Sequence, residues 1–273
     1  MRQAAIVRSG CHLRCRRVIL CWTVRQPAGN RQGYRDMSRL ILVRHGQASA
    51  FTDDYDRLSD LGRKQSGFLG KWWIERGLEI SRVYSGPLNR QRDTAEIVAG
   101  TIRRGGKEMP DPIVLEGLRE IEADRIMAHL QAVREEHPKL DRLIRAYGAA
   151  GDREEKGSIF QEYFEEGMLL WAEGRVDSRG IESLSAFQAR ILESLKSILA
   201  GLSGGEDIAV FSSAGPVTII TGHLLGLDNF RTLELTFRLK NCSVTEFALT
   251  GRGPVLQQFN CTGHLPPEMV TIR

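Results

Sequence analysis

Arg44, His45 and Gly46 follow directly on four aliphatic residues, Leu40 to Val43. The aliphatic run is typical of a short strand that is buried on both faces, as in parallel sheets. Open α/β sheets bind ligands just beyond the carboxyl ends of their strands, so this triplet lies where chemistry is usually done. A neutral His45 can act as a nucleophile near pH 7, Arg44 can bind an anion with forked donors, and Gly46 permits a sharp turn. An ordinary strand-end turn with two polar residues is the alternative interpretation.

Polar residues follow three more predicted strands. Arg90 lies beyond the second strand in the first turn of a helix, where backbone donors and the helix dipole attract anions. Glu120 follows the third strand, and residues 213–215 follow the fourth strand and enter another helix. Four polar strand ends on one edge of a parallel sheet predict a converging pocket.

The apolar periodicity predicts the elements that would position these residues. Strands are expected at 40–43, 80–85, 113–115 and 207–211, with a closing hairpin over 242–249 and 255–259. Amphipathic helices are expected from Ser59 or Asp60 to Gly77, and over 88–103, 183–202 and 214–225. This alternation predicts an α/β fold, a three-layer sandwich with a mostly parallel central sheet and helices on both faces.

Residues 121–178 have a different character. They are strongly charged and helical in period, with breaks at Pro138 and at several glycines. We expect two or three helices inserted between strands, which would form a lid over one side of the domain.

The distribution of charge argues against a polyanion-binding protein. The 273 residues carry a formal net charge of +4. Residues 1–36 hold eight arginines and one acid, whereas residues 37–273 hold 30 basic and 33 acidic side chains and are slightly acidic. A nucleic-acid binder acting through the arginine-rich leader is therefore disfavoured by the acidic body.

The leader at 1–36 has two interpretations. It resembles an organellar transit peptide, being rich in arginine and nearly free of acids, or it derives from a start codon placed too far upstream of Met37. We prefer the second, and expect the leader to be disordered and a single domain to span 37–273.

Other composition features bear on location and cofactors. No run approaches the ~20 apolar residues of a membrane helix, so no membrane partner is expected. Five sparse cysteines argue against a disulfide framework and favour a reducing compartment, the cytoplasm. Cys11, His12, Cys15 and Cys21 match no usual zinc spacing, so no metal is expected.

Taken together, the motifs resemble the histidine phosphatase superfamily, which has the phosphoglycerate-mutase-like fold. The resemblance covers about residues 38–273. It is carried by Arg44-His45-Gly46, Leu58-Ser59 to Gln65, Ser85-Gly86-Pro87-Leu88 with Arg90 and Thr94-Ala95, Leu118 with Glu120, and Ile181-Glu182-Ser183 with Arg190.

The resemblance implies a role for each candidate residue. His45 would accept a phosphoryl group, Arg44 and Arg90 would clamp the phosphate, and Glu120 would protonate the leaving oxygen. A phosphate monoester needs such a set, because catalysis is mainly positioning and charge neutralisation. Glu120 must be protonated for the first step, which a pocket of low dielectric can favour, a surface carboxylate being the alternative. Gln47 is expected to contact substrate, and no cofactor is needed.

One departure from the superfamily pattern concerns the fourth strand end. The superfamily normally has a second histidine there, followed by glycine, whereas this chain has Ser213 followed by Ala214. Its further histidines include His223, about a helix length on, and His264, which reaches the pocket only if the tail folds back. The chain thus resembles a subgroup with serine in place of that histidine. Ser213 can donate a neutral hydrogen bond beside the amides of Ala214 and Gly215, but losing one strong donor costs about 3–4 kcal/mol, or ~10²–10³ in rate.

The sequence therefore predicts a metal-independent phosphomonoester hydrolase that acts on a small phosphorylated substrate through a phosphohistidine at His45. A catalytically impaired phospho-ligand-binding or interaction module, retaining Arg44 and Arg90 for affinity, is one alternative. A phosphoglycerate mutase is a second, which Ser213 makes less plausible because a mutase must protect its phosphoenzyme. The identity of the substrate and the assembly state, monomer or homodimer, stay open.

Overall fold

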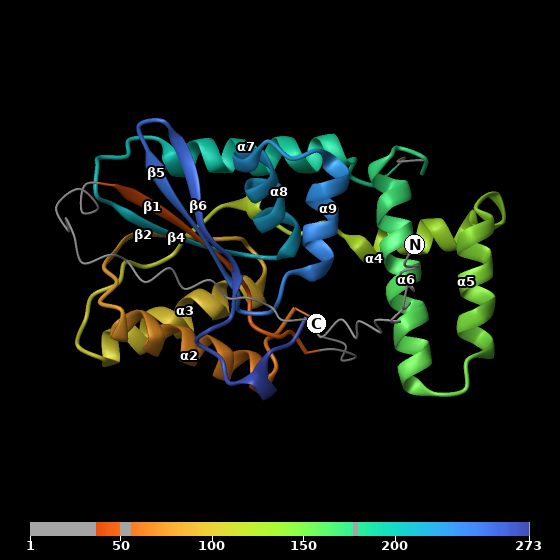
Figure 1. Cartoon of the computed structure of the whole chain (residues 1–273), viewed down its shortest axis with the longest axis horizontal. Coiled ribbons are helices and arrows are strands. Elements are labelled where there is room, and N and C mark those ends of the chain that lie inside the picture. Colours follow the sequence, from red (N-terminus) through yellow and green to blue (C-terminus); the bar gives the residue numbers. More distant parts are fainter. Residues whose placement is uncertain (1–36, 50–55, 177–179, 273) are drawn as a thin grey trace, which may run out of the picture.

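A mixed sheet forms the centre of the fold in the computed structural model, which describes residues 37–49, 56–176 and 180–272 (Figure 1). Within these residues six strands lie in the order β3-β2-β4-β1-β5-β6. Neighbours among β1 to β4 pair in parallel, whereas β5 pairs antiparallel with both β1 and β6. The strands span Ser38–Arg44 (β1), Ile80–Ser85 (β2), Ile113–Val114 (β3), Asp207–Ser212 (β4), Val244–Thr250 (β5) and Gly253–Cys261 (β6).

Strand β1 is buried on both faces, as its aliphatic run predicts. Leu40 and Leu42 belong to the apolar cluster on one side of the sheet, and Ile41 and Val43 to the cluster on the other. This alternation follows from the two-residue period of a strand. The carboxyl end of β1 therefore delivers Arg44 and His45 from a rigid, central position.

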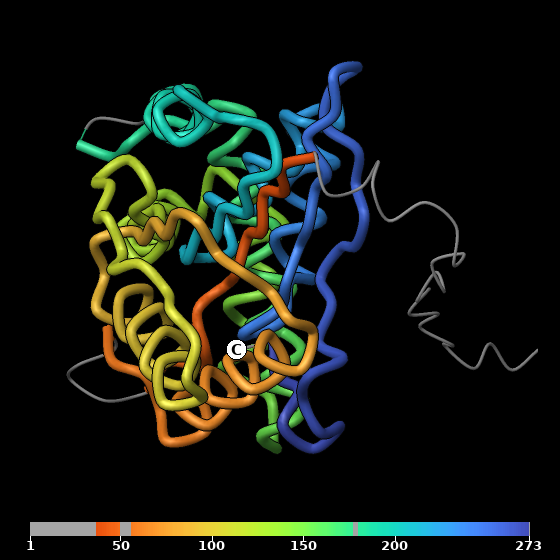
Figure 2. Tube along the Cα trace, turned by 90° about the vertical axis from the view of Figure 1, so that its left-hand side faces the viewer, coloured from red at the N-terminus to blue at the C-terminus, as the bar shows by residue number. Residues whose placement is uncertain are grey.

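Helices cover both faces of the sheet. Figure 1 shows α2 and α3 below it and α7 above it, and Figure 2 shows the same layers after a turn of 90°. The helices outside the insertion span Asp60–Glu75 (α2), Asn89–Arg104 (α3), Leu184–Leu199 (α7), Ala214–Leu225 (α8) and Asn229–Arg238 (α9). The α/β fold with a mostly parallel sheet is thus confirmed. The sequence analysis predicted no element at α9, in which Thr232 and Leu233 are buried, Phe237 is partly buried and Phe230 is exposed.

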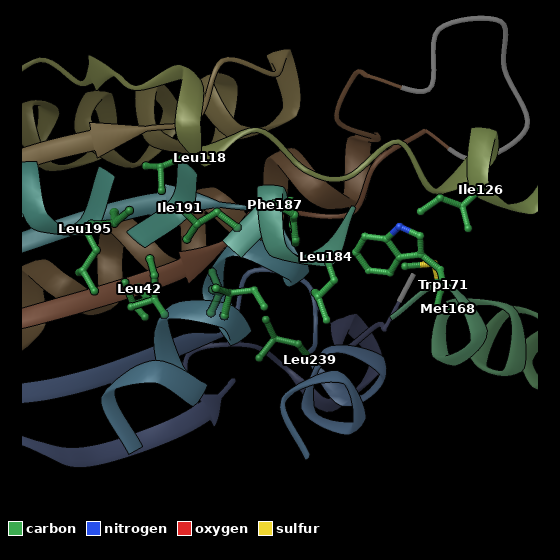
Figure 3. Packing of buried hydrophobic residues seen from close by; sticks show 14 of the residues in the cluster. Leu42, Leu118, Ile126, Met168, Trp171, Leu184, Phe187, Ile191, Leu195 and Leu239 are labelled. Carbon is green, nitrogen blue, oxygen red and sulfur yellow. The ribbon is translucent and has the colours of Figure 1, made fainter. Parts of the chain in front are cut away.

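In its described part, residues 121–176, the insertion forms three α-helices, α4 (Ala123–Ala132), α5 (Pro138–Ala149) and α6 (Arg153–Ala172). Figure 1 shows α5 and α6 side by side, standing away from the sheet. Trp171 at the end of α6 belongs to the same apolar cluster as Leu42 of β1 and Phe187 of α7, as Figure 3 shows. The base of the insertion therefore shares a core with the sheet, next to the segment that carries Glu120.

Replacing Phe211 of β4 by alanine is expected to lower the free energy of unfolding by about 3–5 kcal/mol. The Phe211 ring is fully buried and packs on Trp73 with 5.9 Å between ring centroids, so truncation leaves a cavity under α2. Chemical denaturation measures the loss. Phe230→Ala is the matched control, because its ring is 49% exposed and its loss should cost about 0.5 kcal/mol or less. Equal losses in the two variants would contradict this assignment of the core.

Candidate active site

His45 is held by hydrogen bonds on its backbone and its ring. Its backbone N–H donates to the carbonyl of Ser212 at the end of β4, at 2.8 Å. Its ring Nδ1 lies 2.7 Å from the carbonyl oxygen of Gly46. Because a carbonyl only accepts, Nδ1 carries the proton, and Nε2 is left with the lone pair that a nucleophile needs.

The environment of His45 keeps its ring neutral. Burial, followed by the charges of Arg90 and Arg44, holds the pKa of His45 well below its usual value, although the hydrogen bond to Gly46 acts in the opposite direction. A buried imidazole between two guanidiniums is therefore uncharged at pH 7. Its Nε2 is available to attack an electrophile.

Arg90 lies in the first turn of α3 and faces the histidine. Its Nε lies 3.3 Å from Nε2 of His45, and a terminal nitrogen donates to Oδ1 of Asp56 at 2.8 Å. The other oxygen of Asp56 accepts from the backbone N–H of Asn89 at 2.9 Å. Asp56 thus fixes the guanidinium to the start of α3. No sequence pattern pointed to Asp56, since it lies 34 residues before Arg90 in a polar loop.

Arg44 is oriented by the C-terminal part of the chain. One terminal nitrogen donates to the carbonyl of Leu239, at the end of α9, and to that of Ile272 at 2.7 Å. The tail therefore folds back onto the strand end that carries the nucleophile. Arg44 contributes positive charge at His45 from this fixed position.

Gln47 supports the loop after His45. Its side-chain oxygen accepts from Oγ of Ser59 at 2.8 Å, and its backbone N–H donates to Oε1 of Gln65 at 2.8 Å. Ser59 is the N-cap residue of α2, and Gln65 lies in the second turn of this helix. In this structure the Gln47 side chain binds the protein, and its expected contact with substrate stays a prediction.

Gly46 is required by close packing. Its backbone N–H donates to Oγ1 of Thr94 at 3.1 Å, and a Cβ added to it would lie 2.5 Å from the carbonyl oxygen of Gly62. A side chain at this position would force α2 away from the strand end. The sequence motif thus reflects a close approach between two backbone segments.

Glu120 lies against the start of α8. Its carboxylate accepts from the backbone N–H of Ile121 and from that of Gly215, both at 2.9 Å. A Cβ added to Gly215 would lie 2.3 Å from Glu120, so only glycine permits this contact. The Gly215 amide, which the sequence suggests as a donor to substrate, binds the expected general acid in this structure.

Gln91 is a buried polar residue that the sequence analysis did not single out. Its side-chain amide donates to Oγ of Ser213 at 2.8 Å and to the carbonyl of Leu118 at 3.2 Å. The helical period contained a signal for it, because position 91 shares one face of α3 with buried Thr94, Ala95 and Val98. A polar side chain on the buried face of a helix needs a hydrogen-bond partner, and here the neighbouring strand ends supply it.

A cavity of about 300 Å³ opens beside Glu120. It is large enough to hold the organic part of a small phosphate ester. Its walls come from the segment after β3 and from the region before and within α7, and its lining residues are Arg119, Glu120, Ile121, Glu122, Arg125, Ile181, Glu182 and Arg190.

His264, near the C-terminus, is buried and stacks on Trp72 with 5.4 Å between ring centroids. Burial lowers its pKa to about 4. The unfolded chain takes up this proton near pH 6.5, so it binds more protons than the folded chain between pH 6.5 and 4. The contribution of the neutral His264 ring to the free energy of unfolding is therefore fully present above pH 6.5 and decreases as the pH falls towards 4.

Replacing His264 by phenylalanine is expected to reduce the loss of stability on acidification. The wild-type chain should lose up to about 3 kcal/mol more than the variant between pH 6.5 and 4, because the variant keeps the stack but has no group to protonate. Denaturation midpoints measured across this range provide the test. His223→Gln, at an exposed position, is the control. Parallel curves for wild type and His264→Phe would show that His264 is not the linked group.

Within 37–49, 56–176 and 180–272, no cluster of three or more His, Cys, Asp or Glu side chains is arranged to hold a metal ion. Over the same part of the chain, none of the helices has the length and apolar character needed to cross a membrane.

Comparison with known proteins identifies the class to which this fold and site belong. The family model of the histidine phosphatase superfamily (branch 1) matches residues 40–163 and 147–262. The chain belongs to this superfamily, as its motifs predicted.

Relatives within the class include phosphatases and a mutase. The mitochondrial serine/threonine-protein phosphatase Pgam5 of Drosophila yakuba is 36% identical over 61 residues, which are 22% of this chain and 21% of that protein. The matched part thus spans about a fifth of that curated relative.

Solved structures share the fold at low identity. Phosphoserine phosphatase from Entamoeba histolytica, in complex with 3-phosphoglyceric acid, aligns with a TM-score of 0.54 and 21% identity over 84% of this chain and 100% of that one. Phosphoglycerate mutase from Bacillus anthracis aligns with a TM-score of 0.54 and 16% identity over 86% and 97%.

Proposed function

We propose that this chain hydrolyses phosphate monoesters through a phosphohistidine formed on Nε2 of His45. The observation that carries the proposal is the arrangement of the imidazole. Nδ1 lies 2.7 Å from the Gly46 carbonyl and Nε2 lies 3.3 Å from Nε of Arg90. The lone pair of a neutral ring thus faces a guanidinium suited to bind the phosphoryl group.

The reaction would proceed in two steps. In the first, Nε2 of His45 attacks phosphorus, the bond from phosphorus to the ester oxygen breaks, and that oxygen takes a proton from Glu120. In the second, Glu120 removes a proton from water, the oxygen of this water attacks phosphorus, and the bond to Nε2 breaks. Inorganic phosphate leaves, and both His45 and Glu120 return to their starting protonation states.

Charge neutralisation in this proposal comes from Arg44 and Arg90, with no metal or cofactor in the reaction. Ser213, Ala214 and Gly215 would contribute donors at the start of α8, and the chain would then belong to a subgroup with serine instead of a second histidine. The catalytic unit would be residues 37–273, and the substrate a small phosphorylated molecule whose organic part enters the cavity beside Glu120.

Trapping the intermediate tests the proposal. Rapid quenching with ³²P-labelled substrate in the presence of EDTA should give a labelled protein that is labile to acid and stable to base. The label should be absent in His45→Ala and present in His223→Ala, which changes an exposed histidine of α8. Undiminished turnover without any labelled protein would contradict the phosphohistidine mechanism.

Replacing Arg90 by alanine is expected to lower kcat/KM by about 10²–10³, because the variant loses a guanidinium that neutralises developing charge. Arg90→Lys should recover part of this loss, since an ammonium supplies charge without the forked donors. Steady-state kinetics provide the measurement. Arg92→Ala is the matched control, an exposed arginine two positions along the same helix. An equal loss in the control would argue against a role at the phosphate.

A second candidate function is a phospho-ligand-binding module without significant turnover. It is favoured by the Gly215 amide at the fourth strand end, which donates to Glu120 and is therefore already engaged within the protein. Such a module would bind phosphate but show no turnover above the His45→Ala background. A mutase would instead move labelled phosphoryl groups between the hydroxyls of phosphoglycerate.

A further inference from the structure

Ser213 is the N-cap residue of α8, yet its side chain does not cap the helix. A capping serine accepts from the backbone N–H two or three residues into the helix. Here the third residue is Pro216, which has no N–H, and the second is Gly215, whose N–H donates to Glu120. The local sequence therefore releases the Ser213 hydroxyl from its usual partner.

The partner that the hydroxyl has is Gln91. Nε2 of Gln91 lies 2.8 Å from Oγ of Ser213, and both side chains are buried, at 0% and 1% exposure. Among the described residues, Gln91 is the hydrogen-bond partner of the Ser213 hydroxyl.

The direction of that hydrogen bond is determined by the rest of the Gln91 amide. Its oxygen accepts from the backbone N–H of Leu88 at 3.1 Å, so the nitrogen must be the atom that faces Ser213. The same nitrogen lies 3.2 Å from the carbonyl of Leu118, which only accepts. Gln91 is therefore the donor and Ser213 the acceptor, which leaves the proton of Ser213 available to an acceptor other than Gln91.

The position of Ser213 indicates where that proton is useful. The residue before it accepts from the backbone N–H of His45 at 2.8 Å, and Gly215 contacts Glu120 at 2.9 Å. Ser213 thus lies in the chain between the contact to the nucleophile and the contact to the acid. A donor here would meet the oxygens of a phosphoryl group that is moving between them.

We propose that Gln91 is a positioning residue that occupies the acceptor side of the Ser213 hydroxyl and so directs its proton to the transferred phosphoryl group. The inference rests on the proposed phosphohistidine function. It assigns to Gln91 and Ser213 together the role of the donor that a second histidine has in the superfamily. Gln91 does not touch the substrate and acts through Ser213.

A double-mutant cycle tests this proposal. Ser213→Ala and Gln91→Met should each lower kcat about tenfold, the effect of one neutral hydrogen bond, with little change in KM. The double variant should be no slower than the slower single variant, because both changes remove the same oriented donor. Gln131→Met, at an exposed position of α4, is the matched control.

Ligand binding distinguishes positioning from general damage to the site. Both single variants should bind vanadate, which mimics the pentacoordinate phosphorus, about tenfold more weakly while keeping their affinity for inorganic phosphate. If Gln91→Met does not fold, Gln91→Leu takes its place in the cycle, because leucine is of similar size and likewise has no group that can donate to Ser213.

The outcomes separate this inference from the function on which it rests. Losses that multiply in the double variant, or equal weakening of vanadate and phosphate, would overturn the role of Gln91 while leaving the labelled adduct on His45 intact. A wild-type chain that forms no adduct would overturn the proposed function, and this inference with it.

Discussion

Replacing His45 by alanine is expected to lower kcat/KM for phosphate monoesters by about 10⁴ or more, the largest effect anticipated for this chain. Nε2 of the imidazole would be the atom that bonds to phosphorus, and alanine has no nucleophile to take its place. Affinity for inorganic phosphate should persist, since Arg44 and Arg90 remain. Steady-state kinetics and calorimetric titration with phosphate measure the two effects separately.

The opposite pattern would argue against His45 as the nucleophile. A variant that loses phosphate binding in proportion to turnover would show that the substitution disrupts the anion site as a whole. Thermal unfolding of the variant is the control for folding. Its midpoint should stay close to that of the wild type, because the buried residues Leu40 to Val43 hold β1 in the sheet without the imidazole ring.

Replacing Glu120 by glutamine is expected to lower kcat by about 10²–10⁴ for alkyl phosphates, whose leaving oxygen needs a proton. Glutamine keeps the size of the side chain and an oxygen that can accept from Gly215. With p-nitrophenyl phosphate, whose leaving group needs no acid, the first step should stay fast. Because water activation also requires Glu120, the variant should release one equivalent of p-nitrophenol in a burst and then slow down.

Two comparisons make the Glu120 result specific. Glu116→Gln removes an exposed carboxylate, paired with Arg119 just before the site, and should leave kcat unchanged for both substrates. Equal losses for alkyl and aryl phosphates in Glu120→Gln, without a burst, would remove Glu120 from the role of acid and base.

The sequence by itself determined the sheet and the edge at which the polar residues meet. Strand β1 was predictable because Leu40 to Val43 are apolar on both faces, and α2 and α3 because their apolar residues repeat with a helical period. Such patterns are local, so they survive in the chain without knowledge of its neighbours. The superfamily followed from the same motifs.

Tertiary structure alone decided how the candidate residues are held. Asp56 reaches Arg90 across 34 residues, Gln91 reaches Ser213 across 122, and Arg44 contacts Ile272 across 228. Hydrogen bonds between segments so distant depend on how the layers pack, which no local pattern records. The lowered pKa of His45 has the same origin, because burial and two converging guanidiniums exist only after the strand ends have come together.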